Sequence, residues 1–464
     1  MPAKYHITAH PAPPRFRPEG KLGIVDWRED CSSCHNCVKK KCVYGLYRDE
    51  ADALREEIGY LEYIYQCKGC LTCVQNCTKN ILTRVANPLY KRLGDTYFTP
   101  DIITTTWFQA ETGGVPVSGC GYGGPFSGKG FDSMWTDMSE IVRPTRDGIH
   151  GREYINTGVD IGRKLGRLSF AGMDLRDTAP PRLVSPLPLV FDIVPEQWRH
   201  GPVVSSIVKA AAELRLFSIV SEVQQQQLLL QHKQDTVVPF LENAKDAGHA
   251  AGAPMVVVPD SGDILEITRA LKKEEPQRIV AIRLPATKDV AQRVVRLARE
   301  GAEVVNLAFD RHGREMEAEA PRHMRDALRE IHQALVKEQI RDQVTLMTSG
   351  GIGLPEHMAK AIICGADLVA IDIPLIIAME CRQCGECSRG ERCPVDLAAI
   401  EEKYAVRRVV NLMGSWHSQL LEMLGAMGIR EVRRLRGETG RCMFFEDLER
   451  AAFGRLFGKR KDIQ

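Results

Sequence analysis

The sequence predicts an α/β protein whose centre is a (β/α)8 barrel, with cysteine-rich segments before and after it. From about residue 185, short apolar runs alternate with amphipathic stretches of helical period, and the alternation continues to residue 371. Repeating strand–helix units imply a parallel sheet, either closed as a barrel or doubly wound. Cysteines gather before residue 80 and again between residues 381 and 393, outside the alternating region. We therefore expect a barrel with a cysteine-bearing addition at each end.

Seven strand candidates are short runs rich in Val, Ile and Leu, and an eighth, VVPF at 237–240, would complete a TIM-like (β/α)8 barrel. The seven candidates are residues 187–191, 217–220, 254–258, 278–283, 303–307, 344–347 and 367–371. Between them lie stretches with apolar residues at helical spacing. The helices expected there are residues 203–215, 263–275, 289–300, 323–338 and 355–365.

Composition excludes two classes of partner. Lys and Arg number 62 against 60 Asp and Glu, so no overall field would recruit nucleic acid. The N-terminus lacks the basic and apolar regions of a signal peptide. The most apolar late stretch, at 368–379, is too short to span a bilayer and contains Asp372 and Pro374. We expect a cytoplasmic protein that is not an integral membrane protein.

The fifteen cysteines favour metal or redox chemistry, because disulfides are rare in intracellular proteins. All but three fall into three tight runs. For the three isolated residues, Cys120, Cys364 and Cys442, we expect the role of small buried apolar side chains.

The first two runs each contain C-x2-C-x2-C, a spacing that offers three thiolates from one loop to a cubane iron–sulfur cluster. Zinc sites instead use pairs of cysteines, so iron–sulfur is favoured over zinc. In two-cluster ferredoxins the fourth ligand comes from the other run. That pattern predicts one cluster on Cys31, Cys34, Cys37 and Cys77, and a second on Cys67, Cys70, Cys73 and Cys42. Residues 20–85 thus resemble a bacterial-type two-cluster ferredoxin domain, with a longer interval before Cys42 and no proline after Cys42 or Cys77.

The run VTLMTSGGIGLPEHMAKA at 344–361 reads as strand, glycine turn and helix. In (β/α)8 barrels, phosphate-bearing cofactors commonly lie on the loops after the seventh and eighth strands. Residues 341–397 resemble the end of the FMN-binding synthase domain of glutamate synthase. In that family a glycine loop, an Ala-rich helix, a GAD segment and a cysteine cluster follow in this order, as they do here. With a ferredoxin domain ahead of it, the chain is similar to archaeal-type, stand-alone glutamate synthase subunits.

The resemblance implies four parts and an FMN site. The parts are a two-cluster ferredoxin domain with flanking segments at 1–100, a lead-in segment that packs on the barrel at 101–185, an FMN barrel at 186–380, and a cysteine loop with C-terminal helices at 381–464. The residues that it implies for FMN are Arg283, Ser349, Gly350, Gly351, Gly353 and Ala370. Arg283 replaces a flavin-facing lysine of the fourth strand, and we expect it near the N1/O2 edge of the ring.

The resemblance also implies a third cluster at the end of the barrel. The family pattern is C-x5-C-x4-C, which supplies three thiolates to a [3Fe–4S] cluster. Here Cys381 and Cys387 keep the first interval, Cys393 lengthens the second, and Cys384 is inserted. Four thiolates suit a [4Fe–4S] cluster, so we expect three [4Fe–4S] clusters in the chain.

Several departures fall where the flavin should lie. The family's glycine loop after the fifth strand is replaced by residues 306–321, and DIVPEQWRHG at 192–201 replaces a segment of small residues. Ala370 and Asp372 stand where glycines are expected near the phosphate, and an ionised Asp372 would repel it. Either the barrel keeps FMN with an altered substrate site, or it has lost the flavin.

These observations predict an oxidoreductase, although they identify no catalytic residue. The expected function is an iron–sulfur flavoprotein subunit that relays electrons between ferredoxin-type clusters and FMN within a larger redox complex. Its partners would be ferredoxin or other electron-transfer subunits. One alternative is glutamate synthesis from 2-oxoglutarate and ammonia. The other is an iron–sulfur wiring subunit without flavin.

Overall fold

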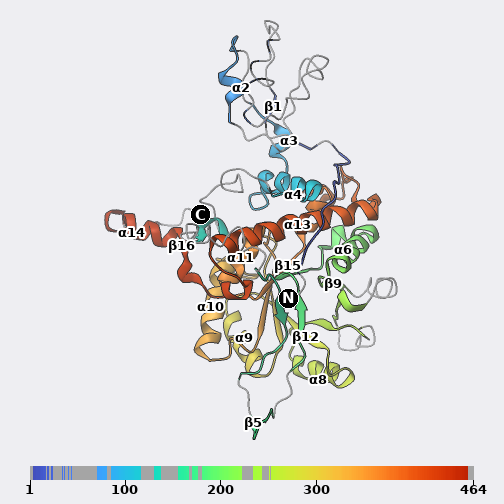
Figure 1. The fold of residues 1–464 in the computed structure, drawn as a ribbon, viewed down its shortest axis with the longest axis vertical. Helices are drawn as coiled ribbons and strands as arrows, with labels where there is room; N and C mark the ends of the chain where they lie inside the picture. The colour runs from blue at the N-terminus through green and yellow to red at the C-terminus, as the bar shows by residue number, and fades with distance from the viewer. Residues whose placement is uncertain are drawn as a thin grey trace.

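Eight parallel strands close into a barrel at the centre of the molecule (Figure 1). The strands are β8 (Leu189–Phe191), β9 (Ser218–Ser221), β10 (Val237–Phe240), β11 (Met255–Pro259), β12 (Ile279–Pro285), β13 (Val304–Ala308), β14 (Thr345–Ser349) and β15 (Leu368–Ile371). They follow one another around the ring in chain order, and β15 pairs with β8 to close it. The predicted (β/α)8 barrel is confirmed.

This computed structural model describes part of the chain. The described residues are 4–16, 18–19, 22–24, 34, 36, 40, 43, 70–80, 85–115, 130–136, 155–166, 170–175, 180–221, 234–242, 250 and 252–457.

The barrel strands are apolar because both of their faces are covered. Every residue of β13 and β14 is buried, and so are the first four residues of β11. Parallel strands between a filled barrel interior and an outer layer of helices read as continuous apolar runs. The alternation of such runs with amphipathic helices is therefore a consequence of the two layers.

The expected barrel helices are all present. They are α6 (Gly201–Leu214), α8 (Ile264–Glu274), α9 (Val290–Arg299), α10 (Met324–Lys337) and α11 (Pro355–Ile363). Proline stands in the first turn of α6 and of α11, where its missing N–H has no intrahelical partner to lose.

The eighth strand candidate, VVPF, is the third strand of the barrel, β10. Two strand numbers in the sequence reasoning are therefore wrong. Arg283 lies on the fifth strand, β12, and the replaced glycine loop follows the sixth strand, β13. The strand numbers were one too low because β10 was not counted among the seven strands. It is short and contains Pro239, and a proline removes one ladder hydrogen bond and weakens the strand pattern.

The barrel ends with an interrupted final unit. The short helix α12 (Ile373–Ala378) follows β15 directly, so it lies at the carboxyl end of the strands. The long helix α13 (Glu402–Ala426) packs against α6 and α11, which places it as the outer helix between the last and the first strand. The third run of cysteines lies in the connection between α12 and α13, which we call the cysteine loop (residues 379–401).

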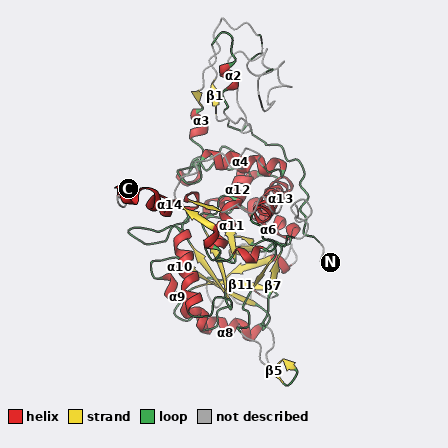
Figure 2. Ribbon diagram, turned by 60° about the vertical axis from the view of Figure 1, so that its left-hand side comes forward, coloured by secondary structure: helices red, strands yellow, loops and turns green. Residues whose placement is uncertain are grey.

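A helix from the N-terminal side covers α12. This helix, α4 (Pro100–Thr112), packs against both α12 and α13 (Figure 2). Thr99 caps its first turn through a hydroxyl that accepts from the N–H of Ile102, and Gly113 ends it in the left-handed conformation. The carboxyl end of the barrel thus carries a layer built from both halves of the chain.

The N-terminal arm (residues 4–16) runs along α13. Asn411 donates to the carbonyl of His10 and accepts from its N–H, and Arg408 donates to the carbonyl of Ala12. The Arg408 side chain is fully buried, and it also donates to the carbonyls of Trp107 and Ala378. A planar guanidinium with several donors suits this arrangement, because it can hold three segments at once.

The cysteine-rich N-terminal region lies between two short strands that pair with each other. Strand β1 (Leu22–Ile24) pairs antiparallel with β2 (Val85–Ala86), and α2 (Thr72–Gln75) and α3 (Pro88–Lys91) are the short helices there. In Figure 1 these elements lie beyond α4, away from the barrel. The predicted ligands Cys31, Cys37, Cys42 and Cys67 lie outside the described residues, as does Cys120.

The remaining elements are short except α14. They are η1 (Gly130–Ser133), β3 (Met134–Thr136), β4 (Val159–Ile161), β5 (Phe170–Ala171), β6 (Asp174–Leu175), β7 (Leu183–Ser185), η4 (Glu196–Trp198), η5 (Gln234–Thr236), η7 (Cys387–Arg389), η8 (Leu397–Ala399), η9 (Val432–Leu435), η10 (Thr439–Arg441), β16 (Cys442–Phe444) and α14 (Phe445–Phe457). Strand β16 pairs with β3.

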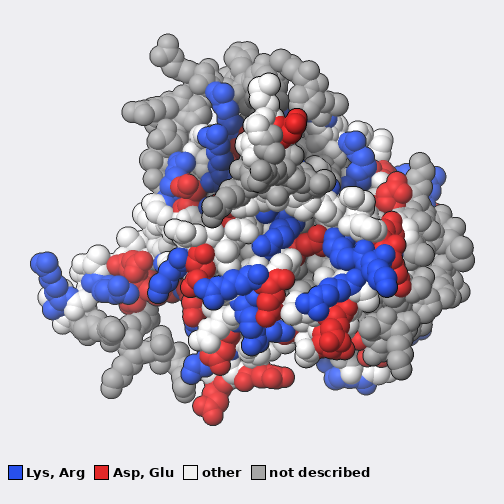
Figure 3. All heavy atoms as spheres, turned by 90° about the horizontal axis from the view of Figure 1, so that it is seen from below, with Lys and Arg blue, Asp and Glu red and all other residues white. Residues whose placement is uncertain are grey.

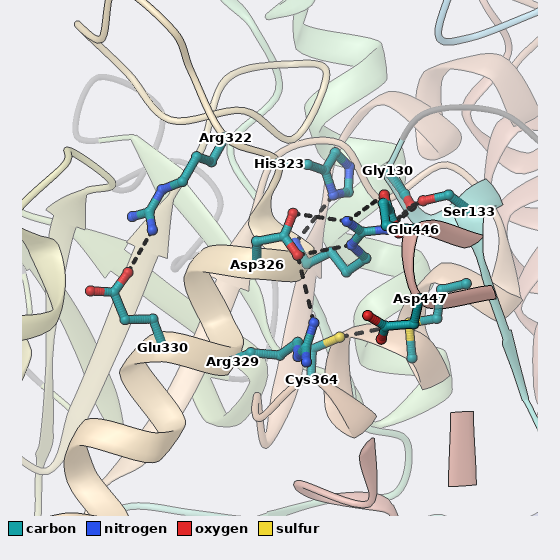
Figure 4. A network of polar contacts seen from close by, with 12 residues as sticks. Gly130, Ser133, Arg322, His323, Asp326, Arg329, Glu330, Cys364, Glu446 and Asp447 are labelled. Carbon is teal, nitrogen blue, oxygen red and sulfur yellow. Dashed lines mark hydrogen bonds and ion pairs between the residues drawn. The ribbon is translucent and has the colours of Figure 1, made fainter. Parts of the chain in front are cut away.

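A polar network joins α10 to the C-terminal elements (Figure 4). The buried Arg325 of α10 donates to Asp326 and to Glu446 of α14, each at a distance of 3.0 Å. It also bonds Ser133 of η1. Beside this network lies Cys364, which is buried as expected, whereas Cys442 on β16 is half-buried. The network holds η1 and the start of α14 against α10.

The surface carries charges of both signs. On the face drawn in Figure 3, basic and acidic side chains are interspersed among the described residues. Among the helices of the described part of the chain, none combines the length and the apolar character that crossing a membrane requires.

Candidate functional site

An ion pair spans the carboxyl end of the barrel. Arg283 on β12 and Asp192, which follows β8, come from opposite sides of the ring, since three strands separate β12 from β8 in either direction. The Arg283 Nη1 lies 2.7 Å from Asp192 Oδ1, and its Nη2 lies 3.1 Å from Oδ2. The Asp192 side chain is 4% exposed. A two-point contact of this kind is the strongest geometry available to arginine and carboxylate.

The charge of Arg283 is therefore already paired. Burial, the largest influence, lowers the pKa of Arg283, but the charge and hydrogen bonds of Asp192, together with the charge of Asp372, raise it overall. The sequence analysis expected Arg283 near the N1/O2 edge of a flavin ring. In the structure its guanidinium is bonded to Asp192, and the charge of Asp372 also acts on it.

Asp372 lies at the end of the last barrel strand. Its Oδ1 accepts from the N–H of Ile373 over 2.6 Å, so its own carboxylate caps the first turn of α12. In (β/α)8 barrels the N-terminus of such a short extra helix is a usual place for a phosphate. Burial, followed by the nearby charge of Asp192, raises the pKa of Asp372 to about 6.

The glycine loop after β14 has the conformation that its sequence predicts. Gly350 and Gly351 have φ values of 88° and 66°, which favour glycine. A Cβ on Gly350 would lie 2.4 Å from the carbonyl oxygen of Asp310, and one on Gly351 would lie 2.3 Å from the nitrogen of Gly313. The segment after β13 therefore packs directly on this loop.

Aromatic side chains pack on the same loop. Tyr97 donates its hydroxyl to the carbonyl of Gly351, and the ring of Phe98 lies 3.1 Å from where a Cβ of Gly353 would be. The N–H of Gly353 donates to Nδ1 of His357 over 3.2 Å. One side of the glycine loop is thus covered by the chain itself.

One buried donor inside the barrel lacks a partner within the described residues. Asn306 on β13 is fully buried, and its Oδ1 accepts from the Ser349 hydroxyl over 3.3 Å, whereas its Nδ2 makes no hydrogen bond. Leaving a buried donor unpaired is costly, so such atoms mark places where a ligand could accept a hydrogen bond.

These observations decide how the site suits FMN. Near β12 and β13 the cation of Arg283 and the free amide donor of Asn306 fit the carbonyl-bearing edge of a flavin ring. At α12 the carboxylate of Asp372 caps the helix N-terminus, the kind of position where (β/α)8 barrels commonly bind a phosphate. The residues therefore fit FMN with Asp372 protonated, because an ionised Asp372 would face a phosphate of the same charge.

The cysteine loop brings four thiols to the carboxyl side of the barrel. Cys381 is 6% exposed, and Cys384, Cys387 and Cys393 are half-buried. Burial is the largest cause that raises the pKa of Cys381 to about 12; the other three cysteines add to it, and the N–H of Gln383 opposes it. Among the described residues, no three metal-ligating side chains are arranged to hold a metal ion.

The cysteine loop is bonded to both segments that flank the N-terminal cysteine region. On the entering side, Arg15 donates to Glu380 from its backbone N–H and from Nε, each over 2.7 Å, and Glu19 pairs with Arg382 at 3.0 Å. On the returning side, the N–H of Gly94 donates to the carbonyl of Arg382 over 3.0 Å. Arg92 also lies 3.7 Å from Glu386.

The described N-terminal cysteines include members of both runs. Cys34 of the first run lies 3.7 Å, Sγ to Oγ1, from Thr78, the residue after Cys77. Cys70 donates to the hydroxyl of Thr72 over 3.3 Å. The contact between Cys34 and Thr78 brings the first run next to the end of the second.

The six residues expected at FMN lie together at the carboxyl end of the barrel. Ala370 on β15 pairs with Ser349 on β14, and the glycine loop follows Ser349. Sequence reasoning missed Asp192, Asn306 and Gln383. The available signal for Asp192 was its position directly after an apolar strand, where polar residues of a barrel commonly serve the site.

Comparison with known proteins identifies one region. Residues 245–430 match the family model described as the conserved region in glutamate synthase. This range includes β12 to β15, the glycine loop and the cysteine loop. The chain therefore carries a glutamate synthase-like domain.

Curated relatives match over most of their length. The archaeal-type glutamate synthase [NADPH] of Dehalococcoides mccartyi is 26% identical, over 89% of this chain and 93% of its own. The archaeal glutamate synthase [NADPH] of Archaeoglobus fulgidus is 25% identical, over 93% and 96%. The corresponding protein of Methanocaldococcus jannaschii is 24% identical, over 92% and 95%.

Among solved structures, a crystal structure of mandelate oxidase matches 65% of this chain and 97% of its own chain, at 15% identity and a TM-score of 0.40. At that score the likeness supports no argument about this chain.

Proposed function

We propose that this glutamate synthase-like oxidoreductase is an iron–sulfur flavoprotein subunit that relays electrons between N-terminal ferredoxin-type clusters, a cluster on the cysteine loop, and FMN at the carboxyl end of the barrel. Its redox partners are ferredoxin or other electron-transfer subunits of a larger complex. The cluster ligands proposed are Cys31, Cys34, Cys37 and Cys77; Cys67, Cys70, Cys73 and Cys42; and Cys381, Cys384, Cys387 and Cys393.

The observation that carries this proposal is the double attachment of the cysteine loop. Both segments that flank the N-terminal cysteine region are bonded to residues next to the cysteine loop, through Arg15 with Glu380 and through Gly94 with Arg382. Electron transfer falls steeply with distance, so clusters in series need short separations. A region tethered at both ends to the loop keeps its clusters near the third one.

The contact of Cys34 with Thr78 supports the proposed sharing of ligands between the two N-terminal runs. In a two-cluster ferredoxin, the last cysteine of each run completes the cluster of the other run. Cys77 is the last cysteine of the second run and adjoins Thr78 in the chain. Its nearness to Cys34 is what a cluster shared by Cys34 and Cys77 requires.

The FMN proposal rests on the similarity to glutamate synthases and on the donors at the barrel end. Bound FMN would link one-electron clusters to a two-electron substrate. Arg283 would stabilise negative charge at one edge of the ring, and Asn306 would donate from its free amide. Ser349, Gly350, Gly351, Gly353 and Ala370 complete the proposed FMN residues, with Asp372 protonated beside the phosphate.

A second candidate function is glutamate synthesis from 2-oxoglutarate and ammonia. It is favoured by the names of the relatives, which match this chain over most of their length. Oxidation of a reduced donor that depends on both ammonia and 2-oxoglutarate would support it. If the reduced donor is oxidised by electron-transfer partners without ammonia and 2-oxoglutarate, the electron-relay proposal is retained and glutamate synthesis is not supported.

The first experiment measures cofactors on the full chain purified without oxygen. We expect about twelve irons, about twelve sulfides and about one acid-released FMN per chain, from three four-iron clusters and one flavin. Cys364→Ala, a buried cysteine outside the three runs, should leave these values unchanged. If the protein contains about twelve irons but binds no flavin even after reconstitution with FMN, the flavoprotein proposal is wrong and the chain is an iron–sulfur wiring subunit. Zinc in place of iron would overturn the proposal.

A further inference from the structure

Gln383 lies between two cysteines of the loop and turns back onto the first. Its backbone N–H points to the Sγ of Cys381 over 3.5 Å, and its side-chain Nε2 lies 3.3 Å from the same sulfur. Both side chains are nearly inaccessible, since each residue is 6% exposed. One residue therefore directs two N–H donors at one buried sulfur.

Two donors directed at one sulfur would stabilise a negative charge on it. A thiol is a weak hydrogen-bond acceptor, and a buried amide usually has a strong one. A thiolate bound to a metal is negatively charged and accepts stronger bonds than a neutral group. The arrangement at Cys381 therefore suits a metal-bound thiolate better than a free thiol.

The backbone of Gln383 supports the same conclusion. Its φ is 50°, in the left-handed region where glycine is the usual residue. Glycine occupies the left-handed positions 385 and 390 of this loop, and Glu380 and Asp396 are its other left-handed residues. A glutamine at position 383 is strained where a glycine would not be. The contact of its side chain with Cys381 offsets that strain, and strain of this kind gathers at functional sites.

We infer that Gln383 raises the reduction potential of the cluster on the cysteine loop through its two N–H···S bonds to Cys381. This inference rests on the proposed function, because it requires that cluster. Reduction adds negative charge to the cluster and its ligand sulfurs. N–H donors stabilise that charge, and hydrogen bonds to the sulfurs are one of the factors that set cluster potentials. Gln383 is a positioning residue, since it acts through Cys381.

The test is redox titration of the full chain, followed by electron paramagnetic resonance. The signal of this cluster is assigned as the one lost in Cys387→Ser. In Gln383→Leu and Gln383→Gly the side-chain donor is gone and the backbone N–H remains. We expect the ratio of reduced to oxidised cluster at a fixed potential to fall on the order of tenfold in both, with iron content unchanged.

Gln339→Leu is the matched control. Gln339 is also a glutamine in the left-handed region, with a φ of 58°, but it is exposed and lies after α10, away from the cysteines. Its substitution should leave the midpoint unchanged. If Cys387→Ser removes a signal but Gln383→Leu does not shift the midpoint potential of that signal, the proposed role of Gln383 is wrong and the proposed cluster is retained. If Cys387→Ser removes neither signal nor iron, the proposed cluster itself is wrong.

Discussion

The guanidinium of Arg283 and the carboxylate of Asp192 meet across the barrel from opposite strands, through two contacts of 2.7 and 3.1 Å. The pair connects positions 91 residues apart in the chain and lies where the strands end. It joins two sides of a ring that is otherwise held by hydrogen bonds between neighbouring strands.

Removing Arg283 should cost much more stability than removing a comparable arginine nearby. Arg283→Ala leaves Asp192 buried and unpaired, so we expect the free energy of unfolding to fall by about 3–5 kcal/mol. Arg293 pairs with Asp260, whose side chain is 16% exposed against 4% for Asp192, and Arg293→Ala should cost at most about 1 kcal/mol. Urea unfolding followed by circular dichroism gives both values, and equal losses would contradict the distinction.

Replacing Asp372 should stabilise the protein at neutral pH. Its pKa is about 6 in the folded protein, above the value of about 3.9 in an unfolded chain. The folded state therefore holds this proton more tightly, and stability falls as pH rises from about 4 through 6. Asp372→Asn keeps an oxygen to cap Ile373 and removes the charge. We expect a gain of about 2–3 kcal/mol at pH 7 and none below pH 4.

That pH dependence is measured by unfolding both proteins in urea between pH 4 and pH 8. Asp260→Asn serves as a control, because Asp260 follows β11, on the opposite side of the ring from β15, and has its own arginine partner. A difference between Asp372→Asn and the parent that did not change with pH would contradict the titration of Asp372.

FMN binding should strengthen as pH falls through 6. A protonated Asp372 removes one negative charge beside the phosphate, so flavin affinity should be higher at pH 5.5 than at pH 7.5. Asp372→Asn should lose most of this dependence and retain the part that comes from the phosphate, whose second pKa is about 6. Quenching of flavin fluorescence measures the affinity. Riboflavin, which has no phosphate, should show little dependence in either protein.

Loosening the attachment of the N-terminal region should slow the relay without removing clusters. Arg15→Ala removes the side-chain contact with Glu380, whose side chain is 5% exposed, keeps the backbone one, and leaves every proposed ligand in place. We expect slower reduction of the loop cluster by the N-terminal clusters in rapid-mixing experiments, with iron content unchanged. Arg389→Ala is the control, because Arg389 pairs with Glu391 on the exposed part of the same loop. Equal rates in both variants would count against the relay.

Changing the inserted cysteine should convert the loop cluster. If Cys384 is the fourth ligand, Cys384→Ser should lower iron by about one per chain and produce the resonance signal of an oxidised three-iron cluster. A chain that keeps its full iron and its four-iron signal would show that Cys384 is not a ligand.

The sequence predicted the barrel because its two layers impose a pattern on the chain. Continuous apolar runs such as those of β13 and β14 follow from burial on both faces, and they are visible without any structure. The proline in β10 weakened that pattern and shifted the strand count. The place of α13 against α6 and α11 could not be read from its own residues, because it depends on how the ring closes.

The site was predictable only in part. The glycines after β14 and the cysteine spacing are local signals, and both lie at the carboxyl end of the barrel. The pairing of Arg283 with Asp192 depends on which strands face each other across the ring. The contact of Gln383 with Cys381 depends on the left-handed backbone of one residue. Neither has a signature in the order of the amino acids.

The attachment of the N-terminal arm to α13 has a consequence for how the protein is made. His10 bonds to Asn411, a partner 401 positions later, and Ala12 bonds to Arg408. On the ribosome, the first two runs of cysteines emerge long before the helix that holds the arm has been synthesised. Contacts of such long range form late in folding. If these cysteines hold the proposed clusters, their thiols must be kept reduced, or take up iron and sulfide, before the arm is attached to α13.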